Sequence, residues 1–143
     1  MEASEILIEK LKEFEGLRLE AYRDAAGVLT IGYGHTGSDI RAGDRISEYW
    51  ASELLRNDLG ATEAAAVRRL HVARTQGQFD ALVSFAFNLG IERLQGSTLL
   101  KVIREGGSHH RIRQEFKRWV YAGGKKLRGL EHRREWEAKR FFD

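Results

Sequence analysis

Apolar residues recur at helical spacing at the start of the chain, and four of them share one face of a helix over 5–14: Ile6, Leu7, Leu11 and Phe14. Gly16 follows where such a helix would end. From Leu17 to His35 the pattern changes to aromatic and β-branched residues clustered around Ala25-Ala26-Gly27. This change predicts a β-hairpin with a three-residue loop whose glycine is left-handed.

After about residue 47 the patterning is helical. Ser47 can cap a helix that ends at Leu59, and an Ala-rich helical stretch follows over about 61–72. A capping box, TQGQ at 75–78, precedes the apolar run FDALVSFAFNLG, which Gly90 ends. Further helices are predicted at about 97–105, 108–119 and 129–141, with a last loop at Ala122-Gly123-Gly124.

These elements predict one α+β domain over 1–143, built as two lobes. The smaller lobe, about 16–58, holds the β-hairpin or a short antiparallel sheet. The larger lobe is helical and comprises 1–15 and 59–143, because so small a hairpin lobe offers the first helix little core.

Composition narrows the function classes. The 143-residue chain has no Cys, which excludes a disulfide scaffold and any cysteine-based metal site or nucleophile. No apolar run approaches the roughly 18 residues of a membrane span, so we expect no stable membrane insertion. The start of the chain carries acids where a secretory signal carries a basic region and an apolar core, so we expect no export signal.

Charge is unevenly distributed along the chain. Residues 101–143 hold 13 basic and 6 acidic side chains, whereas residues 1–100 hold 11 basic and 15 acidic ones. Such a basic third attracts a polyanion: nucleic acid, an anionic cell wall or a membrane surface. A solvated helical surface is the alternative interpretation.

Two carboxylates and a hydroxyl lie in or beside the predicted hairpin. If the loop is Ala25–Gly27, Tyr22 pairs with Thr30, and Asp24 and Thr30 share a face about 7–8 Å apart, close enough to hold one water. A four-residue loop would reverse this parity. Glu15 lies at the C-terminal end of the first helix, where the helix dipole favours the protonated, proton-donating form. Two carboxyls in different environments indicate the acid and base of a glycosidase.

Alternation along the second strand predicts two sets of residues on opposite faces. One set is Val28, Thr30, Gly32 and Gly34, and the other is Leu29, Ile31, Tyr33 and His35. The two glycines either leave room for an extended substrate or ease strand curvature. His35 falls among apolar residues, so we interpret it as structural rather than as a catalytic base.

The spacing of Glu15, Asp24 and Thr30, followed by GYGHT, resembles the phage-type lysozymes, or endolysin muramidases. The resemblance continues through TQGQFDALVSFAFNLG, GSTLLKVIREG and AGGKKLRGLEHRREWE, so it spans nearly the whole chain. It implies a lysozyme-like fold with the active-site cleft between the lobes. It departs from the family pattern where Arg128 replaces a usual proline before the last helix, which affects loop rigidity more than chemistry.

The resemblance implies hydrolysis of the β-1,4 bond between N-acetylmuramic acid and N-acetylglucosamine in peptidoglycan. Glu15 would be the general acid, and Asp24 and Thr30 would position and activate the attacking water, with inversion at the anomeric carbon. No metal and no organic cofactor is implied. An arginine of the last helix, Arg133 or Arg134, would pair with Glu15.

Substrate-binding positions also follow from the resemblance. Gly34 and Thr36 match positions that line the sugar cleft, and Phe87 and Asn88 match positions facing it from the helical lobe. Phe87 lies in an apolar helical run, which is more typical of a core residue. Asn88 interrupts that run, so its amide needs a partner, either backbone or sugar.

The expected protein is a monomer that acts on bacterial peptidoglycan. It would be made in the host cytoplasm without a signal peptide and would act on the cell wall after release. The main alternative is a module of the same fold that binds peptidoglycan without cutting it. Nucleic-acid binding ranks low because the chain lacks an aromatic-basic RNA motif, a zinc finger and a clear helix-turn-helix.

Overall fold

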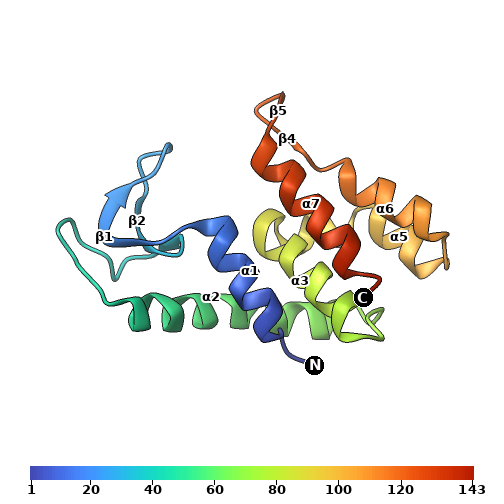
Figure 1. Ribbon diagram of the computed structural model, residues 1–143, viewed down its shortest axis with the longest axis horizontal. Coiled ribbons are helices and arrows are strands. Elements are labelled where there is room, and N and C mark those ends of the chain that lie inside the picture. Colours follow the sequence, from blue (N-terminus) through green and yellow to red (C-terminus); the bar gives the residue numbers. More distant parts are fainter. The chain divides into compact units, whose positions relative to one another are not determined.

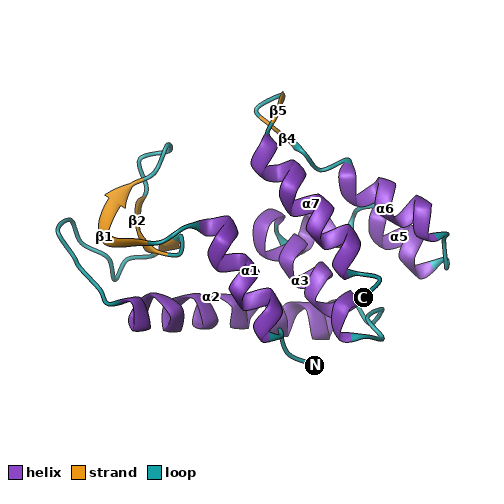
Figure 2. Cartoon of the chain, in the orientation of Figure 1, coloured by secondary structure: helices purple, strands orange, loops and turns teal.

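The computed structural model describes residues 1–143 and is mostly helical, with two short antiparallel sheets (Figure 2). In chain order the elements are α1 (Glu5–Glu15), β1 (Arg18–Arg23), β2 (Leu29–Gly32), β3 (His35–Thr36), α2 (Glu48–Arg69), α3 (Gln76–Leu89), α4 (Ile91–Gln95), α5 (Thr98–Arg104), α6 (His109–Lys117), β4 (Tyr121–Ala122), β5 (Lys125–Lys126) and α7 (Arg128–Arg140). None of the helices has the length and apolar character needed to span a bilayer.

The chain divides into two compact units, which we describe separately. One comprises Ile8–Ala61, and the other comprises Met1–Leu7 together with Thr62–Asp143. Both boundaries fall inside helices, α1 and α2. The predicted lobes, 16–58 and the combination of 1–15 with 59–143, stay a prediction.

In the Ile8–Ala61 unit, β1, β2 and β3 form an antiparallel sheet in that order, with β1 and β2 side by side in Figure 1. Tyr22 pairs with Thr30, as predicted. The loop is also as predicted: Gly27 has φ +82° and donates its N–H to Asp24 O at 2.9 Å. Asp24 N donates in turn to Val28 O at 2.9 Å, which closes the hairpin. The three-residue loop on which the shared face of Asp24 and Thr30 depends is therefore confirmed.

Helix α2 runs without a break from Glu48 to Arg69. Ser47 caps it as predicted, because its hydroxyl accepts from Trp50 N at 3.2 Å. The prediction of two helices separated near Gly60 is wrong. Glycine destabilises a helix interior by only about 1 kcal/mol, and buried side chains on both sides of it, such as Leu59 and Ala65, anchor a single helix.

Gly60→Ala should therefore stabilise the protein by about 0.5–1 kcal/mol, because alanine restricts the unfolded chain and a Cβ at this position meets open space. Urea unfolding measures the change. The matched control is Gly27→Ala: a Cβ there also meets open space, but φ is +82°, so this variant should be destabilised. Equal effects at the two positions would contradict the explanation.

The other unit has its core among α3, α5, α6 and α7. Helix α7 packs on both α3 and α6 (Figure 1). Phe85 of α3 lies edge-on to Phe116 at 6.1 Å and to Trp119 at 5.4 Å between ring centroids. Arg140 near the end of α7 forms an ion pair with buried Asp80 of α3 at 2.8 Å. These contacts fix α7 against the helix that carries Phe87 and Asn88.

Helices α3, α5, α6 and α7 confirm the predicted positions to within two residues at each end. Thr75 Oγ1 accepts from Gln78 N at 3.1 Å, which confirms one half of the capping box. In the other half, Gln78 accepts from Arg74 N rather than from the cap residue itself. The short helix α4 was not predicted. The predicted loop at 122–124 contains the two-residue turn of a β4–β5 hairpin, with Gly123 and Gly124 both at positive φ.

Candidate active site

Glu15 is the last residue of α1. Gly16 ends the helix at φ +72° and donates its N–H to Lys12 O at 3.0 Å. The half-buried carboxyl of Glu15 lies directly over Gly34, since a Cβ added at Gly34 would be 3.0 Å from Glu15 Oε2. Gly34 has φ +79°, so both its conformation and its missing side chain suit the turn beneath this carboxyl.

Asp24 caps the β1–β2 turn with its side chain. Its Oδ1 accepts two backbone N–H groups, from Ala26 and from Val28, each at 2.9 Å. The turn thus holds the carboxylate through one oxygen and does not use Oδ2. The side chain is oriented by the hairpin itself, on an exposed turn.

Thr30 lies on the central strand, opposite Tyr22 on one side and Thr36 on the other. The residue is buried, with 3% of its surface exposed, and its hydroxyl donates to Val28 O at 2.9 Å. Because the hydroxyl proton is used in this bond, Thr30 Oγ1 can only accept from a further partner.

The predicted strand through His35 is wrong. β2 ends at Gly32, and a turn with positive φ at Gly32 (+69°) and Gly34 (+79°) leads into β3, which returns antiparallel. The turn requires both glycines. This role differs from the two predicted ones, room for a substrate and easier curvature of a strand. His35 still lies with the apolar residues, because it pairs with Ile31 across the second hairpin. Whether the glycines also leave room for a sugar stays a prediction.

His35 is buried and structural in its contacts. Its Nδ1 lies 2.8 Å from Asp58 Oδ2, and its Nε2 lies 3.3 Å from Asp39 Oδ2. Burial alone would lower the pKa of His35. The hydrogen bonds and negative charges of Asp58 and, more weakly, Asp39 outweigh burial and raise the pKa above 6.5.

A raised pKa means that the His35 contacts stabilise the fold fully below about pH 6.5 and that this stabilisation is lost as pH rises through the folded-state pKa. The unfolding free energy should fall over that range. His35→Gln should lose about 1–2 kcal/mol at pH 5.5 and show a flatter pH profile. Urea titrations between about pH 5 and 9 measure both. The exposed His132→Gln should keep the wild-type profile, and a His35→Gln profile as steep as the wild type would contradict the assignment.

In the helical unit, Asn88 has a side-chain partner. Arg134 Nη2 donates to Asn88 Oδ1 at 3.0 Å. Arg134 also forms an ion pair with Glu137, 2.8 Å between Nε and Oε1, and both side chains are fully buried. Ser84 donates to Glu137 Oε2 at 2.6 Å. Burial raises the pKa of Glu137 and lowers that of Arg134, while their attraction opposes both shifts.

The structure brings some of the predicted site residues together. Glu15 and Gly34 meet in one unit, a contact that the sequence did not predict, and the predicted pairing of Tyr22 with Thr30 is present there. Phe87 is half-buried and, with Asn88, belongs to the other unit. The pairing of Glu15 with an arginine stays a prediction, as do all substrate contacts.

The buried Arg134–Glu137–Ser84 network was missed. Two signals pointed to it: a hydroxyl within the apolar run of α3, and an acid three residues after an arginine on α7.

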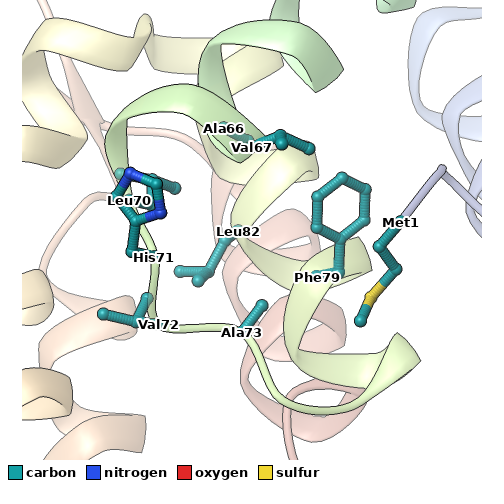
Figure 3. A pocket seen from close by; sticks show the side chains of 9 residues that line it. All are labelled: Met1, Ala66, Val67, Leu70, His71, Val72, Ala73, Phe79 and Leu82. Carbon is teal, nitrogen blue, oxygen red and sulfur yellow. The ribbon is translucent and has the colours of Figure 1, made fainter.

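A separate hollow of about 200 Å³ lies in the helical unit, between the end of α2 and α3. Figure 3 shows Leu70 and His71 on its left and Phe79 and Met1 on its right. It is lined by none of the predicted site residues. The structure also brings together no group of three or more His, Cys, Asp or Glu side chains that could hold a metal ion.

Comparison with known proteins places this geometry in a family. The family model of phage lysozyme matches residues 12–137. The chain is 43% identical over 144 residues to an endolysin of Bacillus phage B103, a match covering 99% of this chain and 54% of that protein. It is 41% identical over 143 residues to an endolysin of Bacillus phage PZA, covering 99% of this chain and 55% of that protein. The chain thus spans about half the length of these curated relatives.

Solved structures agree with the sequence comparison. The endolysin from Escherichia coli O157:H7 phage FAHEc1 superposes with a TM-score of 0.89 at 37% identity, covering 100% of this chain and 94% of that one. The muramidase domain of SpmX from Asticaccaulis excentricus superposes with a TM-score of 0.88 at 38% identity, covering 99% of this chain and 98% of that one. The predicted lysozyme-like α+β fold is confirmed, and the chain belongs to the phage lysozyme family.

Proposed function

We propose that the chain is a peptidoglycan hydrolase: a muramidase that cleaves the β-1,4 bond between N-acetylmuramic acid and N-acetylglucosamine. Membership of the phage lysozyme family supports the reaction class, since its relatives include endolysins and a muramidase domain. The observation that carries the assignment of residues is that Glu15, Asp24 and Thr30 are all fixed by one compact unit, Ile8–Ala61.

Glu15 is the proposed general acid. As the C1–O bond to the leaving sugar breaks, Glu15 transfers its proton to the leaving oxygen. Glu15 is the last residue of α1, so the helix fixes the backbone from which the carboxyl extends. A Cβ at Gly34 would lie 3.0 Å from Glu15 Oε2, so glycine at this position leaves space beside the carboxyl.

Asp24 and Thr30 are proposed to hold the attacking water. A water donates two hydrogen bonds, and each residue offers an acceptor: Asp24 Oδ2, which the turn does not use, and Thr30 Oγ1, whose own proton is directed to Val28 O. With both protons held, a lone pair of the water points away from them toward the anomeric carbon. As the water adds to C1, its proton passes to Asp24.

Inversion follows if the water enters opposite the leaving oxygen. This geometry requires the carboxyls of Glu15 and Asp24 to lie about 6.5–9.5 Å apart with the sugar bound. Gly34, Thr36, Phe87 and Asn88 are proposed to contact the glycan. No metal or organic cofactor takes part in the proposed steps.

Two substitutions separate the turn role of Asp24 from its charge. Asp24→Asn keeps an oxygen that accepts from Ala26 N and Val28 N, so the unfolding free energy should change by less than about 0.5 kcal/mol while hydrolysis falls about 100-fold or more. Asp24→Ala should lose activity and also about 1 kcal/mol of stability. Rates on purified peptidoglycan and urea midpoints measure the two effects. Full activity of Asp24→Asn would remove the proposed base.

The proposed function is tested by exposing purified peptidoglycan to the chain and measuring clearing and new reducing ends. A muramidase clears the suspension and releases reducing sugars. An amidase clears it and releases amino groups instead, and a module that only binds peptidoglycan co-sediments without clearing. Proton NMR of the first-formed anomer tests inversion: a product that first appears in the β configuration would contradict it.

A further inference from the structure

The basic part of the chain is concentrated on one exposed segment, residues 111–128, which comprises most of α6 and the β4–β5 hairpin. This segment appears in orange between the α6 and β5 labels of Figure 1. Its one acidic residue, Glu115, already forms an ion pair with Arg118 at 3.1 Å. Six further cations are all exposed: Arg111, Arg113, Lys117, Lys125, Lys126 and Arg128.

Several cations of this segment lie next to one another and so repel each other. Arg113 and Lys117 are four residues apart on α6 and so are neighbours of like charge, which destabilises a helix by a few tenths of a kcal/mol. Lys125 and Lys126 are consecutive on β5, and only Lys126 has an acid near it, with Glu131 at 3.9 Å. A bound polyanion would remove this repulsion, because each anionic group would lie between cations.

The segment is suited to a hydrophilic polymer rather than to a bilayer. The apolar residues of α6, Ile112 and Phe116, are buried at 5% and 0% exposure, so this helix has no apolar face to insert. For a single-stranded nucleic acid the segment offers one exposed ring, that of Tyr121, where such binders use several stacked aromatics. Guanidinium groups bind phosphate in bidentate geometry, and Arg111, Arg113 and Arg128 supply three of them.

We propose that residues 111–128 form a binding surface for a phosphodiester polymer of the bacterial wall. The surface would hold the chain at the wall through repeated phosphate contacts, independently of the bond it cuts. The inference rests on the proposed function only in placing the chain at the wall. Binding itself depends on the exposed cations.

The test measures binding of poly(glycerol phosphate) by calorimetry over a range of salt concentrations, with three forms of the full chain. The segment variant is Arg111→Gln/Lys117→Gln/Lys125→Gln. The matched control is Arg41→Gln/Arg68→Gln/Arg93→Gln, which removes the same number of exposed cations outside the segment. Thermal unfolding confirms that each variant is folded.

We expect the segment variant to bind about 30- to 100-fold more weakly than the wild type, and the slope of log affinity against log salt to fall by about 2. The control should bind like the wild type. Equal weakening of both variants would show an effect of net charge alone and would overturn the proposal, as would absence of binding at low salt.

Two further probes separate other partners. Tighter, segment-dependent binding to vesicles of pure phosphatidylglycerol, or to duplex DNA, would replace the wall polymer with a membrane or a nucleic acid and overturn the proposal. Clearing of phosphate-free peptidoglycan by the wild type is measured in parallel. If clearing fails while segment-dependent phosphate binding persists, the proposed function is wrong, whereas the proposed binding surface is supported.

Discussion

Glu15→Gln should reduce the clearing of purified peptidoglycan by about 100- to 10,000-fold, because the amide keeps the size and polarity of the side chain but cannot donate a proton to the leaving oxygen. Glu15 is half-buried at the end of α1 and lies over Gly34, and glutamine has nearly the same size and shape as the glutamate it replaces. The unfolding free energy should therefore stay within about 1 kcal/mol of the wild-type value.

The control is Glu13→Gln, on the same helix. Glu13 is exposed, with an ion pair to Lys10 at 2.8 Å, so its loss should leave clearing within about two-fold of the wild type and stability nearly unchanged. Glu15→Gln must also still co-sediment with peptidoglycan. A Glu15→Gln chain that clears peptidoglycan as fast as the wild type would remove Glu15 from the proposed mechanism.

The largest effect on stability is expected at Glu137. Glu137→Gln removes the negative partner of Arg134 while leaving that guanidinium fully buried, and an uncompensated buried charge destabilises a protein by about 3–5 kcal/mol. The oxygen of glutamine can still accept from Ser84, so the loss would come from charge rather than from a lost hydrogen bond. Urea unfolding followed by circular dichroism measures it.

Two further variants show whether the loss of stability in Glu137→Gln comes from the unpaired buried charge. Glu135→Gln, exposed on the same helix, should change stability by less than about 0.5 kcal/mol. In the double variant Arg134→Met/Glu137→Leu both charges are replaced by apolar groups, so it should be more stable than Glu137→Gln alone, although Asn88 loses its partner. A double variant less stable than the single one would show that hydrogen bonds, not the unpaired charge, dominate at this site.

The hairpin that carries Asp24 and Thr30 was predictable because its determinants are local. A loop of three residues ending in glycine fixes the register, and Asp24 is one residue before it, where a carboxylate caps the turn. The family resemblance then named the same residues on independent grounds. Neither source required knowledge of distant contacts.

The errors in the predicted limits of helices and strands arose at glycines, because a glycine can lie within a regular element or in a turn. A helix was predicted to end at Leu59, before Gly60, but buried side chains on both sides of this glycine keep α2 continuous. Gly32 and Gly34 were interpreted as strand residues, but positive φ at both makes them a turn. A single sequence does not give the sign of φ, since glycine adopts either sign at little cost.

Side-chain contacts between residues distant in sequence could not be predicted, for a different reason. His35 meets Asp58 from 23 residues away, and Arg134 meets Asn88 from 46 residues away. Periodicity indicates which side of a helix is buried but not which polar groups meet there. The interpretation of His35 as structural was possible from its alternation with apolar neighbours, whereas the identity of its acidic partners was not.

The loop Ala25–Gly27 has a consequence for comparing related genomes. Its two alanines are exposed, and substitution there should be neutral, whereas insertion or deletion of one residue would place Thr30 on the opposite face from Asp24. Among natural variants of this chain, the number of residues between Asp24 and Thr30 should therefore vary less than their identity. A homologue with one residue more or fewer in this loop is a candidate for a relative that has kept the fold and lost hydrolysis.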